Sequence, residues 1–261
     1  MSTPQPAAAP VFSMSGRIGV WVHVTETMTG HIHDIQAAGF DYILLKIADG
    51  SAGANTYHLA ALQRIVHDAA TVNIPLVAWA YVTPTDIPGQ VAAILKALPA
   101  GVNDLVLDAE IEFEQAAAPG GSLGPATTIM RIHQLCQALL AGRKGLRLHL
   151  SSFWSTKFHA SLPFRTFAQH CATLQPQCYL ETGSRSAHEI LDGALTQWGA
   201  LVTKGKNAVL PTINNTQFVP ILKAKQFTAF NVYCFDPKDG DAEVGAHLAT
   251  WKAAIAQFRA K

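Results

Sequence analysis

The chain has 261 residues, a formal net charge of +1, and a composition that is 49% hydrophobic and 14% charged. This composition supports a large hydrophobic core and excludes a disordered chain. A net charge near zero gives no field that would gather nucleic acid, so nucleic acid is not an expected partner. The four cysteines have no paired spacing, which predicts reduced, mostly buried thiols rather than disulfides or metal ligands.

The first 15 residues are rich in proline and alanine and predict a flexible leader, followed by one domain over residues 16–261. They lack the basic and apolar regions of a signal peptide, and no run of apolar residues is long enough for a membrane span. We therefore expect a protein made in the cytoplasm. It would meet a substrate outside the cell through lysis, in a phage particle or by a dedicated export system.

Strand and helix patterns alternate along the rest of the chain. In chain order, the expected strands, each followed by its helix, are Gly19–Val24 and Ile32–Ala38, Tyr42–Ala48 and Tyr57–Val72, Pro75–Val82 and Ile87–Leu98, Val106–Glu114 and Thr127–Ala141, Leu146–Phe153 and Phe164–His170, Ala172–Tyr179 and His188–Val202, Ala208–Ile213 and Gln217–Lys225, and Ala229–Phe235 and Ala242–Phe258. Eight such units predict an α/β fold of the (β/α)8 TIM-barrel type in a single domain.

The fourth expected strand has an unusual pattern of acids. It reads VLDAEIEFE and carries a carboxylate at every second position, at Asp108, Glu110, Glu112 and Glu114. If the strand continued, all four would point to one face. Reactive groups of these barrels lie at the carboxyl ends of the strands, so we expect Asp108 and Glu110 at the mouth. Glu112 and Glu114 are then expected on the loop beyond, at the rim of a substrate groove.

Other polar and aromatic residues are also expected at the mouth, because they lie at the carboxyl ends of the other strands. Aromatic faces, carboxylates and amides together are typical of surfaces that bind sugars. The residues expected to bind substrate are His23, Lys46, Trp79, Tyr81, Glu112, Gln177, Tyr179, Asn214 and Asp236. His149 and Ser151 are also expected at this end, after the fifth strand.

Two close carboxylates are the groups that glycoside hydrolysis requires, because one donates a proton to the leaving oxygen while the other stays ionised. Mutual repulsion raises one of the two pKa values, and an inward-pointing Lys46 would lower the pKa of the acid it touches. We assign Glu110 as the general acid because it lies nearer the rim, and Asp108 as the charged partner. Their spacing in sequence is compatible with both retention and inversion.

Several segments carry a resemblance to a known family. GVWVHV, AAGFDYILLKIADGS at Ala37–Ser51, NIPLVAWAYV at Asn73–Val82 and LVLDAE at Leu105–Glu110 resemble the first half of the family 25 glycoside hydrolases. Those are barrel lysozymes that cut peptidoglycan, and the resemblance implies catalysis by Asp108 and Glu110 without a cofactor. Where that family has a first-strand aspartate, this chain has Trp21 or His23. The second half, with SSFW, FHASLP and QPQCY, is more similar to an uncharacterised bacterial and phage group of related barrels.

Three functions follow as hypotheses. The leading one is a lysozyme-type glycosidase whose partner is a polysaccharide substrate. The second is an inactive barrel that binds glycans or forms part of a larger, phage-like assembly, in which the acids merely pair with Lys46 or Arg147. The third is a metal-dependent hydrolase using His23, His149 and Asp108; the His31 and His33 pair falls outside the first strand, where such enzymes carry their histidines. We expect no metal and no cofactor.

Overall fold

The structure is a computed structural model that describes residues 12–22, 28, 30–50, 59–181, 185–203, 205–235 and 247–260. Its strands form one closed, all-parallel barrel, because β5 pairs with both β4 and β6. The strands are β1 (Ile18–Val22), β2 (Tyr42–Asp49), β3 (Leu76–Val82), β4 (Asp104–Ala109), β5 (Arg147–Phe153), β6 (Cys171–Cys178), β7 (Ala208–Val209), β8 (Thr212–Ile213) and β9 (Phe230–Phe235). The (β/α)8 barrel expected from the sequence is confirmed, as a single domain.

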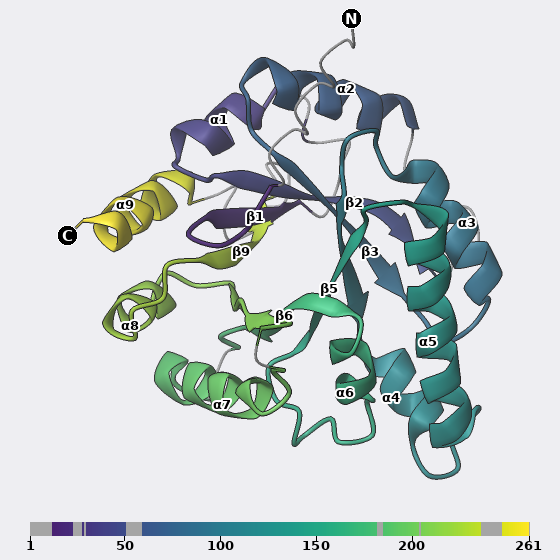
Figure 1. Cartoon of the computed structure of the whole chain (residues 1–261). Helices are drawn as coiled ribbons and strands as arrows, with labels where there is room; N and C mark the ends of the chain where they lie inside the picture. Colours follow the sequence, from purple (N-terminus) through teal and green to yellow (C-terminus); the bar gives the residue numbers. More distant parts are fainter. Residues whose placement is uncertain are drawn as a thin grey trace, which may run out of the picture.

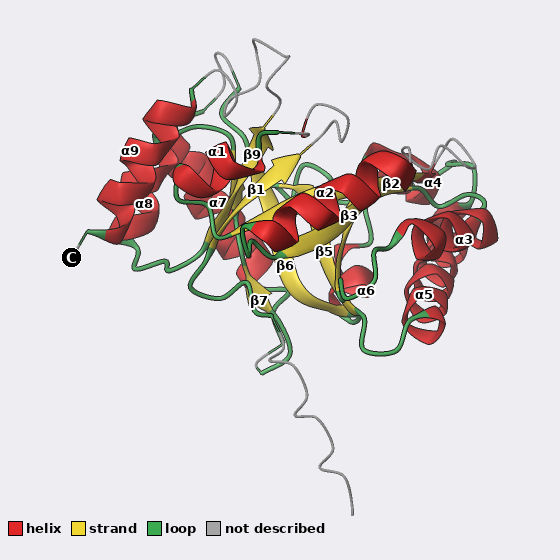
Figure 2. Cartoon of the chain, turned by 90° about the horizontal axis from the view of Figure 1, so that it is seen from above, coloured by secondary structure: helices red, strands yellow, loops and turns green. Residues whose placement is uncertain are grey.

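The helices surround this barrel, as Figures 1 and 2 show. They are α1 (Ile32–Ala37), α2 (Leu59–Thr71), α3 (Ile87–Ala97), α4 (Ile111–Ala117), α5 (Gly124–Gly142), α6 (Phe164–Ala168), α7 (Ala187–Gly199), α8 (Phe218–Ala224) and α9 (Leu248–Arg259). No helix among the described residues has both the length and the apolar character that a membrane span requires.

The seventh expected strand, Ala208–Ile213, is interrupted in the structure. β7 pairs with the start of β6, whereas β8 pairs with the end of β6 and with β9. Pro211 lies between them and has no N–H to donate, so it cannot continue a regular ladder. The two short pieces together occupy one position in the barrel wall.

The acidic stretch also differs from its expected course. β4 ends at Ala109, and α4 begins at Ile111, so Glu112 and Glu114 lie in the first turn of a helix. The alternation of all four acids on one strand face is therefore wrong beyond Glu110, and so is the expected loop. Acidic side chains are favourable in a first helical turn, where the backbone N–H groups are unpaired.

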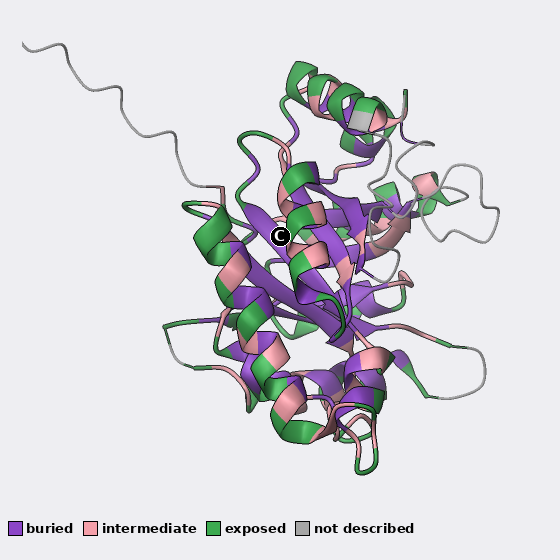
Figure 3. Cartoon of the chain, turned by 90° about the vertical axis from the view of Figure 1, so that its right-hand side faces the viewer, coloured by how far each residue is buried: buried purple, intermediate pink, exposed green. Residues whose placement is uncertain are grey.

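Buried side chains form two layers, and Figure 3 shows how burial concentrates in the barrel strands. The larger layer lies between the strands and the helices. The smaller one lies inside the barrel and consists of Met14, Trp21, Tyr42, Leu44, Val77, Trp79, Val106, Leu210 and Ala229. The apolar interior is thus short, which leaves both ends of the barrel to polar groups.

Part of the expected leader contacts the amino end of the barrel. Met14 is 5% exposed and belongs to the interior layer. The Phe12 ring stands edge-on to Tyr42 at 5.4 Å, and the Phe12 carbonyl accepts a hydrogen bond from Arg147. The segment from Phe12 to Ser15 thus packs on the barrel, and residues 1–11 lie outside the described part of the chain.

Candidate functional site

The acid pair lies at the carboxyl end of β4. Asp108 is 7% exposed and Glu110, which immediately follows the strand, is half-buried. Nε2 of Gln177, at the end of β6, donates to Oδ1 of Asp108 at 2.8 Å and to Oε1 of Glu110 at 2.9 Å. The same nitrogen lies 3.3 Å from Oγ of Ser151 on β5. One amide group therefore fixes both carboxylates relative to each other.

The environment shifts both acids in the same direction. Burial raises the pKa of Asp108 well above its usual value, and the negative charge of Glu110 raises it further. Hydrogen bonds from Ser151 and Gln177 and the charge of Lys46 act in the opposite direction. Burial also raises the pKa of Glu110, against the lowering effect of Gln177. Asp108 is the more buried of the two acids, so its ionised form depends on the compensation from Ser151, Gln177 and Lys46.

Lys46 and Trp79, both expected to bind substrate, are buried side chains on the neighbouring strands β2 and β3. Nζ of Lys46 is 3.2 Å from Oδ2 of Asp49 and 4.9 Å from the centre of the Trp79 ring, in a cation–π contact. Trp79 is 2% exposed, and its Nε1 donates to the Val22 carbonyl at 3.1 Å. Its ring is therefore part of the wall behind the acids.

The first turn of α4 supplies two further acids beside the pair. The Tyr81 hydroxyl donates to Glu112, which, together with burial, raises the pKa of Tyr81. Nδ1 of His159, in the loop after β5, lies 2.7 Å from Oε2 of Glu114. The His159 ring stacks on Phe153 at 3.7 Å, and its charge lowers the pKa of Glu110. These contacts tie the loop after β5 to the loop after β4.

The remaining expected residues lie around the other side of the mouth. The Tyr179 ring stacks on Tyr233 at 5.2 Å, and burial raises the pKa of both hydroxyls. Oδ1 of Asn214 accepts a hydrogen bond from the backbone N–H of Leu180 at 2.7 Å, so this amide holds the loop after β6. His23 and Asp236 lie outside the described residues.

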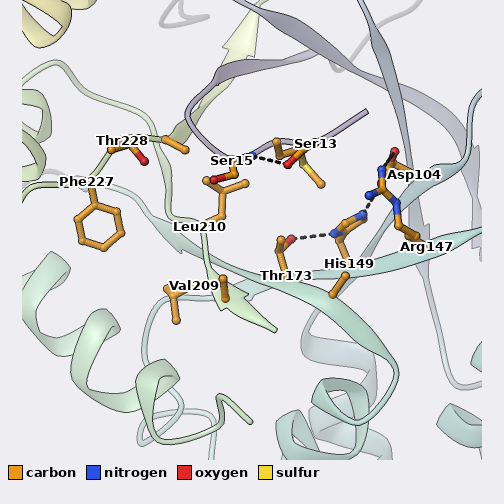
Figure 4. A pocket seen from close by; sticks show the side chains of 14 residues that line it. Ser13, Ser15, Asp104, Arg147, His149, Thr173, Val209, Leu210, Phe227 and Thr228 are labelled. Atoms are coloured by element: carbon orange, nitrogen blue, oxygen red, sulfur yellow. Dashed lines mark hydrogen bonds and ion pairs between the residues drawn. The ribbon is translucent and has the colours of Figure 1, made fainter. Parts of the chain in front are cut away.

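His149 is not at the mouth. It lies at the amino end of the barrel, where Nε2 is 2.9 Å from Oδ1 of Asp104 and Nδ1 is 2.8 Å from Oγ1 of Thr173 (Figure 4). Arg147 also pairs with Asp104, at 2.7 Å, and these side chains line a cavity of about 370 Å³. Burial lowers the pKa of His149.

This position separates His149 from Asp108, two of the residues of the hypothetical metal site, by the apolar layer at Val106. In the described ranges, no three His, Cys, Asp or Glu side chains are arranged to hold a metal ion. The alternative ion pair of Arg147 is formed with Asp104 and not with the acid pair. Arg147 and His149 therefore belong to a polar cluster at the opposite end.

Two residues of the site were not selected as site residues from the sequence. Ser151 was expected at the strand end, but its hydrogen bond to Asp108 was not. His159 lies in an irregular loop, and nothing in its local sequence indicates that it reaches Glu114, 45 positions away. Only the closed barrel brings these two segments together.

No family model matches the sequence, and no curated protein is significantly similar to it. Solved structures do resemble the fold. The chitinase domain of the spore coat protein CotE from Clostridium difficile matches with a TM-score of 0.51 at 9% identity, over 79% of this chain and 65% of that one. This chain thus spans slightly less than two thirds of that domain.

Two more similar structures are glycoside hydrolases. A family 18 N-acetylglucosaminidase from Paenibacillus barengoltzii has a TM-score of 0.53 at 12% identity, over 75% of this chain and 67% of that one. A family 5 enzyme from Prevotella bryantii has a TM-score of 0.60 at 11% identity, over 94% and 96%. These likenesses give no support to family 25 in particular. At such identities they establish the fold: this chain is built like the barrels of known glycoside hydrolases.

Proposed function

We propose that the protein is a glycoside hydrolase of lysozyme type that cleaves peptidoglycan or a related polysaccharide. The observation that carries the proposal is the pair Asp108 and Glu110, which one amide of Gln177 holds together at the carboxyl end of β4. Active sites of (β/α)8 enzymes lie at this end, and paired carboxylates are the equipment of most glycosidases.

In the proposed mechanism, the pair carries one proton over an intermediate pH range, since burial and mutual repulsion oppose the ionisation of both acids. Glu110 is the more exposed acid and donates this proton to the leaving glycosidic oxygen. Asp108 is the ionised member of the pair throughout this step, and Ser151, Gln177 and Lys46 stabilise its negative charge. The charge that develops on the sugar in the transition state is opposite in sign, so the ionised Asp108 favours it.

The geometry of the pair favours retention of the anomeric configuration. Both bonded oxygens lie within hydrogen-bond distance of the same Gln177 nitrogen, at 2.8 and 2.9 Å. These two oxygens are therefore at most about 5.7 Å apart, which fits the separation of about 5–5.5 Å in retaining enzymes better than the roughly 6.5–9.5 Å of inverting ones. The sequence alone left this point open.

The substrate class is proposed from two lines of support. The residues around the acids include half-buried tyrosines and amide side chains, which suit the hydroxyl and acetamido groups of sugars. Two similar folds belong to a chitinase domain and an N-acetylglucosaminidase, by name enzymes of N-acetylated sugars. Peptidoglycan contains such sugars, as the resemblance to barrel lysozymes also implies.

The test is digestion of purified peptidoglycan and of chitin by the protein and by its Glu110→Gln variant, with new reducing ends as the measurement. We expect release by the unmodified protein and a loss of at least about 100-fold in the variant, the usual contribution of a general acid. Asp192→Asn, at an exposed position of α7, is the matched control and should release sugar at the original rate. Background release by all three proteins on both substrates would contradict the proposal and favour an inactive, glycan-binding barrel.

A further inference from the structure

The loop after β5 presents aromatic side chains beside the mouth. Phe158 is 59% exposed, and its ring stands edge-on to Trp154 at 5.7 Å. The guanidinium of Arg185, just before α7, lies over both rings, 4.7 Å from the centre of Phe158 and 5.4 Å from that of Trp154. We call Trp154, Phe158 and Arg185 the aromatic shelf. Phe158 is therefore not an isolated apolar residue, because it stands beside a tryptophan and a cation.

The backbone that carries the shelf is held in place by α7. The side-chain oxygen of Gln197 accepts hydrogen bonds from the Lys157 N–H at 2.9 Å and from the hydroxyl of Ser155 at 3.2 Å. Oγ of Ser155 in turn accepts from the N–H of Phe158 at 3.3 Å. Phe158 therefore stays exposed on an ordered turn, and a ligand that stacks on it would lose little loop entropy on binding.

Trp154 packs against helix α7. The indole N–H of Trp198 donates to the Trp154 carbonyl at 3.0 Å. A methyl group at Gly193 would lie only 2.8 Å from the Trp154 ring, so the absence of a side chain there allows the ring to lie against α7. The tryptophan is thus supported from below and leaves its neighbour Phe158 to face outward.

His159 connects the shelf to the acid pair. His159 follows Phe158 directly, stacks on Phe153 and binds Glu114 at 2.7 Å, and its charge acts on Glu110. A chain of sugars with one glycosidic bond at Glu110 would pass His159 to reach the shelf. Two cationic side chains, Arg185 and the exposed Lys157, lie beyond His159, and Glu189 is the carboxylate that interacts with Arg185 there.

We propose that the aromatic shelf is a distal subsite for a glycan that carries carboxylate groups, with a sugar ring on Phe158 and the carboxylate near Arg185. This inference rests on the proposed function in taking the glycan to be the substrate chain. Sugar rings bind aromatic faces through their C–H groups, and an arginine is the side chain best suited to a carboxylate. In peptidoglycan, the lactyl group of the muramic acid residues supplies that carboxylate when the peptides are removed.

The test measures binding, so it does not depend on turnover. The probes are peptide-free peptidoglycan glycan strands and the same strands after their carboxyl groups are converted to methylamides. Each is titrated against the Glu110→Gln protein and against the same protein with Phe158→Ala, with Arg185→Gln, or with Met130→Ala. Met130, on α5, is 49% exposed and far along the chain from the shelf, and it serves as the matched control for removing an exposed apolar side chain.

We expect Phe158→Ala to weaken the binding of both strands about tenfold, since ring stacking does not need the carboxylate. Arg185→Gln should weaken the binding of the acidic strand about fivefold and leave the amidated strand unchanged. Met130→Ala should bind like the parent protein. The inference is overturned if the parent protein binds neither strand, if Phe158→Ala binds as the parent does, or if Arg185→Gln affects both strands alike.

The two experiments together also test the subsite and the proposed glycosidase activity independently of each other. Shelf-dependent binding by a protein that releases no reducing ends would support the subsite and contradict the glycosidase. Hydrolysis that Glu110→Gln abolishes, together with binding that no shelf variant changes, would support the glycosidase and overturn the subsite.

Discussion

Nε2 of Gln177 lies 2.8 Å from Oδ1 of Asp108, across the end of β5, and the same nitrogen reaches Glu110. This contact favours the ionised form of both acids and lowers both pKa values. We expect Gln177→Met to lower kcat about tenfold and to move both limbs of the pH profile of kcat/KM to higher pH. The same change at the exposed Gln169 should alter neither. A profile that keeps its position in Gln177→Met would show that the amide is not what sets the acidity of the pair.

Asp108 should limit the stability of the fold at neutral and alkaline pH. Its pKa is raised by burial, so its folded value exceeds the unfolded one. Stability is then fully present below the unfolded pKa of the acid and is lost as the pH rises through the folded pKa. Asp108→Asn removes the buried charge, and we expect it to raise the free energy of unfolding at pH 8 by about 1 kcal/mol while abolishing activity. Urea unfolding at pH 8 and pH 5 checks this, because the gain must shrink at pH 5.

For His149 we expect the opposite pH dependence, a loss of stability as the pH falls. Burial lowers its pKa, so the folded protein binds a proton less readily than the unfolded chain does. Stability is therefore present above the unfolded pKa, about 6.5, and is lost as the pH falls below it. We expect His149→Gln to flatten the decline of the unfolding free energy between pH 7 and pH 5. His33→Gln, on the exposed face of α1, should leave the slope as it is; an unchanged slope in both variants would assign the decline to other groups.

Met14 offers a test of the contact between the amino-terminal segment and the barrel. It is 5% exposed and packs in the interior layer, whereas Met130 is 49% exposed. We expect Met14→Ala to lower the free energy of unfolding by about 2–3 kcal/mol. Met130→Ala should change it by less than about 0.5 kcal/mol. Equal effects of the two substitutions in urea titrations would mean that the segment does not pack on the barrel in solution.

The close spacing of the acids predicts the stereochemistry of the products. The oxygens of Asp108 and Glu110 that share the Gln177 nitrogen are at most about 5.7 Å apart, which favours the short carboxyl separation of retaining enzymes, so we expect the first product to keep the anomeric configuration of the substrate. Proton NMR during the first minutes of digestion of a soluble oligosaccharide distinguishes the two anomers before they equilibrate. An inverted first product would rule out the proposed arrangement of Asp108 and Glu110.

The periodicity of the sequence was enough to predict the barrel and the face of each strand, because every second residue of β4 and β5 points inward. It could not predict how far along the barrel axis each inward-facing residue lies. His149 and Ser151 share a face of β5, yet one meets Asp104 at the amino end and the other meets Asp108 at the carboxyl end. The position of a residue along the barrel axis depends on the register between neighbouring strands, which is a property of the closed barrel.

Other features depended on local geometry that the pattern does not specify. The spacing of Glu112 and Glu114 fits a strand as well as the first turn of a helix, and the chain adopts the helix. The contact of His159 with Glu114 joins two loops that only the fold brings together. Pro211 did carry a readable signal, because a residue without an N–H breaks a strand ladder.

Val106 lies between Asp104 and Asp108 on the inward face of β4 and is fully buried. It separates two electrostatic environments: the cavity with Arg147 and His149 at the amino end, and the acid pair at the carboxyl end. Together with the other residues of the interior layer, this valine keeps the charges at the two ends of the barrel apart, although it belongs to neither polar group.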